Sequence, residues 1–172
     1  MEKVSRSKGR PMKVLVTRDK IASAALKIVE RKGLESLSMS AVARSMRVST
    51  AALYNHISNK EELLALVQDD LIAKVDLSAL ELALEGEIGP YEGLRHWAWS
   101  YRDILAANIP LIRVITELPL QGSPQTTAMY ELLVQVIALA GVPEIAVITR
   151  LVALESFVFG SAYDLSLIHI SE

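Results

Sequence analysis

The segment from Ser38 to Leu63 limits the possible folds of this chain more than any other. It contains two short helical patterns, joined by the turn Arg47-Val48-Ser49, and the second pattern covers only Thr50 to Ile57. A lone helix of fewer than about 12 residues is marginal in water, because its nucleation costs more entropy than a few hydrogen bonds recover. Neighbouring helices must therefore hold both segments in place. Two short helices with this connection have the proportions of a helix-turn-helix unit.

Cap residues and apolar spacing predict the helices of this unit. Thr17 is expected to cap a first helix with the 3, 4, 7 spacing of an amphipathic face, and Gly33 is expected to end it. Ser38 and Ser49 are the expected caps of the two short helices. The expected inward-facing residues of the three helices are Ile21, Ala24, Ala25, Ile28, Val29, Val42, Ala43, Met46, Ala52, Leu53 and Ile57.

The rest of the chain also shows helical patterns. Ser58-Asn59-Lys60-Glu61 fits an S-x-x-E capping box and starts a fourth helix, which should run to around Leu77 with Leu63, Leu64, Val67, Leu71 and Val75 on one side. Further helices are expected over residues 90–108, 109–118, 124–140 and 143–165. The sequence therefore predicts an all-α fold, in which an N-terminal three-helix helix-turn-helix domain is joined through a fourth helix to a C-terminal helical bundle.

Four segments follow from this pattern. We expect a flexible basic arm over residues 1–16, the helix-turn-helix domain over 17–62 and a helical effector-binding and dimerisation domain over 63–164. The last eight residues, "LSLIHISE", carry no helical stripe. We interpret 165–172 as a non-native tail, such as a translated vector segment, so that the natural chain would continue differently and could contain one more helix.

Charge divides the chain into two parts. Residues 1–60 contain 13 Lys and Arg against 4 Asp and Glu, whereas the remainder contains 5 and 16. A basic first third on an acidic body is typical of a polyanion-binding module carried by a second domain. Chance clustering of solvated charges is the alternative reading.

Composition excludes several classes of function. The chain has no cysteine, which removes disulfides, thiol catalysis and cysteine-bound zinc and fits a cytoplasmic protein. No catalytic or metal-binding motif is present, so we expect neither an enzyme nor a metal or other cofactor. No apolar run approaches the roughly 20 residues that span a bilayer, so no membrane partner is expected.

The second short helix has the chemistry of a DNA probe. Its start, Thr50-Ala51-Ala52, is small enough for close approach to base edges and thymine methyl groups. Tyr54 and His56, near its end, can reach phosphate oxygens. Lys60 begins the next helix, where free N–H groups already attract anions. Each residue also has an ordinary reading: Tyr54 as a core aromatic, His56 and Lys60 as solvated surface groups.

From Thr17 to about Leu66, the chain resembles the DNA-binding domain of the TetR family of bacterial repressors. The segment "LSMSAVARSMRVSTAALYNHISNKEELL" carries the resemblance, through the small start of the third helix, "LY-x-H" and the polar "NK". The resemblance implies a homodimer that binds a near-palindromic double-stranded DNA operator. It also implies a C-terminal helical domain that dimerises and binds a small-molecule effector.

The family's DNA contacts carry over to named positions of this chain. Thr50 and Ala51 match the base-reading start of the recognition helix, and Tyr54, Asn55 and His56 match its base-contacting and backbone-contacting end. Lys60 matches a phosphate-binding lysine. Two positions depart from the pattern: Ser40 stands where relatives often have a larger donor such as arginine, and Arg47 stands where the turn usually has glycine. Arg47 would be strained by about 1 kcal/mol if its φ is positive, and its side chain could contact a phosphate instead.

The second domain is less informative. Trp97 and Tyr101 share a helix face and are either core residues or part of a ligand cage. Polar residues inside apolar runs cost free energy to bury unless paired, so they are candidates for an effector cavity. The candidate effector-binding residues are Trp97, Tyr101, Arg102, Arg113, Gln135 and Glu155. The apolar stretch "ALESFVFGSAYD" is expected to pack against its own copy in a two-fold dimer.

These observations favour a ligand-responsive transcriptional regulator, most simply a repressor that is released from its operator by the effector. A sequence-independent, nucleoid-type DNA-binding protein is the alternative, which the acidic second part disfavours.

Overall fold

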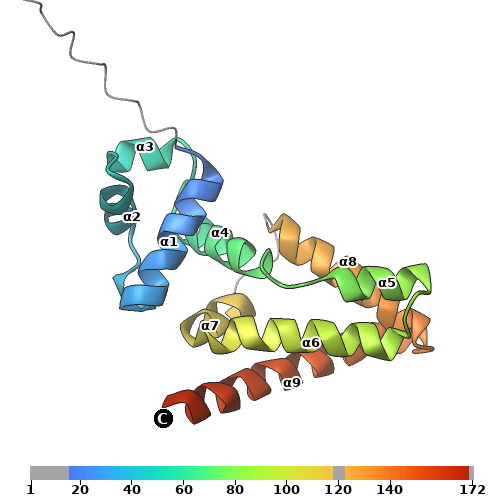
Figure 1. The fold of residues 1–172 in the computed structure, drawn as a ribbon. Helices are drawn as coiled ribbons and strands as arrows, with labels where there is room; N and C mark the ends of the chain where they lie inside the picture. The colour runs from blue at the N-terminus through green and yellow to red at the C-terminus, as the bar shows by residue number, and fades with distance from the viewer. Residues whose placement is uncertain (1–15, 118–122, 171–172) are drawn as a thin grey trace, which may run out of the picture.

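The computed structural model describes residues 16–117 and 123–170 of the chain, and the regular elements in these ranges are all helical. The DNA-binding candidate region is built from α1, a short 3-10 turn, α2 and α3, and α4 leads from it into a bundle of five further helices (Figure 1). The helices are α1 (Arg18–Lys32), η1 (Leu34–Ser36), α2 (Met39–Met46), α3 (Thr50–Tyr54), α4 (Lys60–Ile72), α5 (Ser78–Glu85), α6 (Pro90–Ala106), α7 (Ile109–Glu117), α8 (Pro124–Leu139) and α9 (Glu144–Ile170). The basic arm lies almost wholly outside the described residues.

The predicted caps of the first three helices are confirmed. The side chains of Thr17, Ser38 and Ser49 each accept a backbone N–H from the first turn of the helix that follows. Gly33 ends α1 with a φ of 78°. These caps are local interactions, so the residue types alone were sufficient to predict them.

The third helix is shorter than the prediction of Thr50 to Ile57. It ends at Tyr54, and residues 55–57 form a turn in which the N–H groups of His56 and Ile57 both donate to Leu53 O. Ile57 is nevertheless buried, as expected for an inward-facing residue. The turn therefore keeps Ile57 in the core although the helix has already ended.

The predicted capping box at the start of the fourth helix is wrong by one residue. Asn59, not Ser58, is the N-cap, and its side chain accepts the N–H of Glu62 over 2.8 Å. Glu62, not Glu61, reaches back and accepts the N–H of Ser58 over 2.7 Å. Asn and Ser are comparable N-caps, so the sequence pattern alone could not decide between the two registers.

The fourth helix ends earlier than predicted, and the sequence analysis missed α5. After Ile72 the chain turns, and Asp76 accepts both the backbone N–H and the hydroxyl of Ser78. Val75 and Leu80 are buried on both sides of this turn. The apolar pattern therefore continues across the break and hides it.

The bundle contains one close approach between helices. Gly93 of α6 is buried against α5, and a Cβ atom at this position would lie 2.7 Å from Ala79 O and 2.9 Å from Ala83 Cβ. Only glycine allows this spacing, because either contact is shorter than van der Waals packing permits. Trp97, Tyr101 and Leu105 continue the buried face of α6 into the core.

The last helix corrects two expectations. α9 continues through Ile170, so the terminal segment that was expected to lack a helical pattern is largely helical. Its residues Glu144–Leu165 are also long and apolar enough to cross a membrane by length and composition, contrary to the expectation that no run approaches this length. This helix carries Arg150 and Glu155 and packs against α6, α7 and α8 (Figure 1). Length and composition alone are weak support for a membrane span, and the helix packing fits a protein bundle.

Candidate nucleic-acid interface and effector cavity

Helix α3 is fixed by one buried face and presents the other to solvent. Leu53 and Ile57 are 0% and 1% exposed and belong to the same hydrophobic core as residues of α1 and α4. On the opposite face Ala51 and Asn55 are exposed, and the side chain of Tyr54 is 54% exposed. The reading of Tyr54 as a core aromatic is therefore wrong. Thr50 is half-buried at the start of the helix.

Arg47 has the backbone conformation that a glycine would usually supply. Its φ of 57° and ψ of 40° lie in the left-handed region, and among the described residues it is the one non-glycine residue with positive φ. The N–H groups of Arg47 and Val48 donate to Arg44 O and Ala43 O, which closes α2. The guanidinium-bearing side chain is exposed beside the turn. This arrangement leaves it available to an external anion.

The turn between α3 and α4 is clamped to α1 by one arginine. Arg18 Nη1 donates to His56 O over 2.7 Å and to Glu62 Oε1 over 2.5 Å. The backbone hydrogen bond from Ser58 and the neighbouring Arg18 lower the pKa of the Glu62 carboxyl. Glu62 also accepts a hydrogen bond in the cap of α4. The first turn of α4 and Arg18 of α1 therefore together fix the turn that follows α3. The remaining predicted contacts, Ser40 and Lys60, are exposed, and His56 is half-buried.

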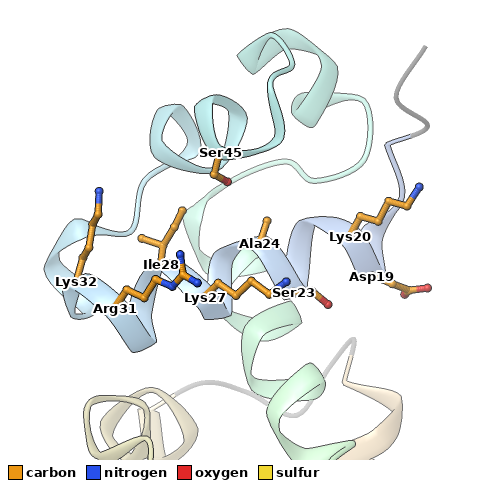
Figure 2. Close-up of a pocket in the computed structure, with 9 residues that line it drawn as sticks. All are labelled: Asp19, Lys20, Ser23, Ala24, Lys27, Ile28, Arg31, Lys32 and Ser45. Carbon is orange, nitrogen blue, oxygen red and sulfur yellow. The ribbon is translucent and has the colours of Figure 1, made fainter. Parts of the chain in front are cut away.

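A basic groove along α1, which the sequence analysis did not single out, adds cations to this domain. Figure 2 shows Lys20, Lys27, Arg31 and Lys32 along α1, with Asp19 near its start and Ser45 facing them from α2. The groove has a volume of about 580 Å³. Four cations against one carboxylate fit a polyanion better than an apolar molecule. The excess of basic residues in the first third was the available signal.

Together these features define a class of protein. A short helix with small and polar residues exposed, connected by a left-handed turn, packed on the core that it shares with neighbouring helices and surrounded by cations, is a helix-turn-helix DNA-binding domain.

The bundle contains a separate cavity of about 520 Å³ between α7, α8 and α9. Its walls are mostly apolar, with Glu155 and Tyr130 among the polar members. Tyr130 Oη donates to Glu155 Oε1 over 2.6 Å, and Tyr101 Oη donates to the same oxygen over a longer 3.4 Å. Burial raises the pKa of Glu155, and burial together with the adjacent carboxylate raises the pKa of both tyrosines. The cavity thus has an apolar lining and an acidic centre.

The predicted effector residues fall in different places. Glu155 lines this cavity, Tyr101 contacts Glu155, and Trp97 is buried beside Tyr101 with a ring-centroid distance of 5.5 Å. Arg102 is half-exposed and pairs with Asp103, so it does not line this cavity. Gln135 lies in a shallower, neighbouring groove and donates to Glu131 O. The side chain of Arg113 lies outside the described residues.

The sequence analysis missed two polar groups inside the helical bundle. Tyr130 is the closest hydrogen-bond partner of Glu155, and Gln68 of α4 is 1% exposed with neither amide atom hydrogen-bonded. Trp97 Nε1 also has no hydrogen-bond partner. Gln68 lies one turn from Leu64 and Leu71 on an apolar stripe, and this polar interruption was the signal. Tyr130 does not interrupt an apolar stripe in this way, so nothing in the sequence indicated its contact with Glu155.

Comparison with known proteins finds similar transcriptional regulators. The sequence pattern described as "Bacterial regulatory proteins, tetR family" matches residues 21–67. The chain is 31% identical over 170 residues to an HTH-type transcriptional regulator of Saccharopolyspora erythraea, covering 93% of this chain and 63% of the relative. It is 27% identical over 157 residues to the HTH-type transcriptional repressor DrrR1 of Streptomyces coeruleorubidus, covering 91% and 56%.

A solved structure agrees with these relatives. The crystal structure of the Streptomyces coelicolor TetR family protein ActR in complex with (S)-DNPA has a TM-score of 0.75 and 28% identity, covering 88% of this chain and 72% of that one. Residues 21–67 therefore match the tetR family of bacterial regulatory proteins, and 88% of the chain shares the fold of a TetR family protein. The relatives named above are transcriptional regulators, in agreement with the expectation that the chain is not an enzyme. The chain spans 63% and 56% of the lengths of the two relatives named above.

Proposed function

We propose that this protein is a ligand-responsive transcriptional repressor that binds a near-palindromic operator as a homodimer in the cytoplasm. The observation that carries the proposal is the exposure of Ala51, Tyr54 and Asn55 on a helix whose opposite face is locked in the core. A rigid helix with an exposed face is what major-groove recognition requires. Relatives that are named as regulators support the same reading.

The proposed contacts divide into two kinds. Thr50, Ala51 and Asn55 read base edges, because Ala51 is small and Thr50 and Asn55 carry short polar groups at the two ends of α3. Tyr54, His56, Lys60, Arg47 and Ser40 contact the sugar-phosphate backbone and set the register. The cations of α1 strengthen the attraction to DNA without reading sequence.

A homodimer is supported by the exposed face of α9. Ile145, Ile148 and Val152 are exposed large apolar residues on one side of this helix, three and four positions apart. A cluster of this kind is characteristic of an interface, because scattered apolar residues do not concentrate on one element. Ile148 and Val152 also line the cavity beside Glu155, so a second copy on this face would cover the cavity opening. A C2 dimer would place two α3 helices toward successive major grooves, which are about 34–36 Å apart.

Helix α4 is the proposed route from the effector cavity to DNA. Contacts with α1 include the Arg18–Glu62 pair, the Ser23–Asp70 hydrogen bond of 3.3 Å and the Lys74–Glu30 ion pair of 3.8 Å. At the same time Asp69 accepts N–H groups from the start of α8, which lines the cavity. An effector that favours a different position of α8 would therefore shift α4 and the paired recognition helices.

The DNA proposal is tested with the full chain and the intergenic DNA upstream of its own gene. Fluorescence anisotropy across about 50 to 200 mM salt should show tight binding that weakens steeply, because counterions are released from phosphates. Random DNA of equal length is the control and should bind at least about 1,000-fold more weakly. Equal affinity for both DNAs would instead favour the sequence-independent alternative, and absent binding would overturn both.

The dimer is tested by light scattering after gel filtration. Ile145→Asp should convert the protein to a monomer, because it places a carboxylate in the proposed apolar interface. Leu84→Asp, on α5, is the matched control: Leu84 is also an exposed large apolar residue, and it should leave the mass unchanged. A wild-type monomer at all concentrations would contradict the dimer proposal.

A further inference from the structure

The cavity between α7, α8 and α9 has one dominant polar group. Ile115, Leu151, Val152 and Phe159 contribute apolar walls, and the hydroxyl of Ser156 is already used in a 2.8 Å hydrogen bond to Val152 O. Tyr130 directs its hydroxyl to Glu155 rather than to the cavity. A ligand in this cavity therefore meets an apolar surface and the carboxyl group of Glu155.

The hydrogen bonding of Glu155 leaves acceptor capacity unused. Both phenol hydroxyls, from Tyr130 and Tyr101, donate to Oε1. In the part of the chain that the structure describes, Oε2 receives no hydrogen bond and no Lys, Arg or His forms an ion pair with Glu155. A carboxylate can only accept hydrogen bonds, and a half-buried one is stabilised by a counter-charge. A ligand group that complements Oε2 would therefore donate hydrogen bonds or carry positive charge.

The aromatic surroundings favour the same charge. Phe159 lines the cavity, and its ring packs edge-on against Tyr101 at a centroid distance of 6.0 Å. Tyr130 contributes a second aromatic wall. The faces of such rings attract cations and repel anions, particularly where water is excluded.

We propose that this cavity binds a lipophilic organic cation, in which a protonated amine pairs with Glu155 and an apolar body contacts Ile115, Leu151 and Phe159. The inference rests on the proposed function, because it names the chemical class of the effector. A volume of about 520 Å³ suits a small organic molecule. A ligand with a carboxylate in the same position would face Glu155 with like charge.

A second groove, whose charged residues are positive instead of negative, provides an internal control. It has a volume of about 360 Å³, lies between α6, α8 and α9, and has Arg95 and Arg150 at an otherwise apolar lining. Arg150 lies only five residues before Glu155 on the same helix but does not line the acidic cavity. Substitution of Arg150 therefore changes the charge of α9 without changing the proposed cation site.

The experiment measures binding of decylamine, 1-decanol and decanoate to the full chain by titration calorimetry at pH 7, below the micelle concentrations. Wild-type protein should bind decylamine roughly tenfold or more tightly than decanol, as expected for a partly desolvated ion pair. Decanoate suits the two arginines of the second groove, so its binding should not change in Glu155→Gln. Glu155→Gln should lose this preference and retain decanol binding. The glutamine oxygen can still accept both phenol hydrogen bonds, so the variant is expected to fold. Arg150→Gln should bind decylamine as the wild type does.

Three results would overturn the inference: equal binding of decylamine and decanol by wild-type protein, no binding of any of the three, or undiminished decylamine binding by Glu155→Gln. The first two need no variant, so the test does not depend on the folding of Glu155→Gln. Operator binding is measured on the same preparations by anisotropy. Failure of DNA binding with intact amine preference would overturn the repressor proposal alone, whereas intact DNA binding without amine preference would overturn this inference alone.

Discussion

Asp69 of α4 caps the start of α8 through Thr126, whose backbone N–H donates to Asp69 Oδ1 over 3.1 Å. The same oxygen accepts the N–H of Gln125 over 2.8 Å. Ser123, the expected cap of α8, makes no side-chain capping hydrogen bond. The helix that connects the two domains therefore supplies the cap of a helix in the second one, and a change in either helix is felt by the other.

Removing this cap should weaken the link between the domains. Asp69→Ala is expected to lower the free energy of unfolding by about 1 kcal/mol, the usual cost of a lost N-cap. Asp69→Asn keeps an acceptor oxygen and should lose less. Chemical denaturation measures both values. Equal stability of Asp69→Ala and the wild type would show that the α4–α8 hydrogen bonds contribute nothing to the folded state.

Arg47 should show opposite effects on stability and DNA binding. Arg47→Gly is expected to raise the free energy of unfolding by about 1 kcal/mol, because glycine adopts positive φ without strain. The same change should weaken operator binding and reduce the slope of log affinity against log salt by about 1, since one phosphate contact is lost. Arg47→Ala separates the effects: it keeps the strain and loses the charge. Unchanged salt dependence in both variants would exclude the phosphate contact.

Substitution of Leu53 should reduce stability, whereas substitution of its neighbour Tyr54 should reduce DNA binding. Leu53→Ala removes a fully buried side chain and is expected to cost about 2–5 kcal/mol of stability. Tyr54→Ala removes an exposed side chain and should change stability by less than about 0.5 kcal/mol while it weakens operator binding. Tyr54→Phe isolates the hydroxyl group. Thermal unfolding and DNA anisotropy distinguish the two, and a large stability loss in Tyr54→Ala would argue against an exposed recognition surface.

Gly93→Ala should destabilise the bundle without affecting the DNA-binding domain directly. The added methyl group would lie 2.7 Å from Ala79 O, which is backbone and cannot rotate away. Overpacking of this kind costs about 1–3 kcal/mol. Gly160→Ala, on α9, is a matched control because a Cβ there meets no atom within 4 Å. Comparable stability of the two variants would contradict the close α5–α6 contact.

Glu155 should make stability depend on pH. Burial raises its pKa above the ordinary 4.5, so the folded protein holds this proton more tightly than the unfolded chain does. The stability associated with the proton is present below about pH 4.5 and is lost as pH rises through the raised pKa. Glu155→Gln cannot titrate, so the variant should gain stability relative to the wild type as pH rises from about 4.5 through the raised pKa of Glu155. A difference that is constant with pH, measured by urea denaturation, would contradict the buried carboxyl.

The sequence was most informative where interactions are local. Thr17, Ser38 and Ser49 each cap the helix that follows them, and Leu53 and Ile57 are buried as their spacing predicted. The candidate DNA contacts lie on this locally determined unit, and the structure leaves Ala51, Tyr54 and Asn55 exposed there. The sequence could not decide between Ser58 and Asn59 as the N-cap of α4, because both residue types cap helices. It also missed the break between α4 and α5, because buried apolar residues such as Val75 continue across it.

By itself, the sequence determined that the chain is helical, that its N-terminal third contains a helix-turn-helix unit capped by Thr17, Ser38 and Ser49, and that positive charge collects there. Only the tertiary structure decided that Asp69 caps α8, that α5 packs against Gly93 and that Tyr101 and Tyr130 converge on Glu155. The physical reason is distance along the chain. Caps and helix periodicity relate residues three or four positions apart. The hydrogen bond between Tyr130 and Glu155 joins residues 25 positions apart, and the one between Asp69 and Thr126 joins residues 57 positions apart. Only the packed bundle brings such residues together.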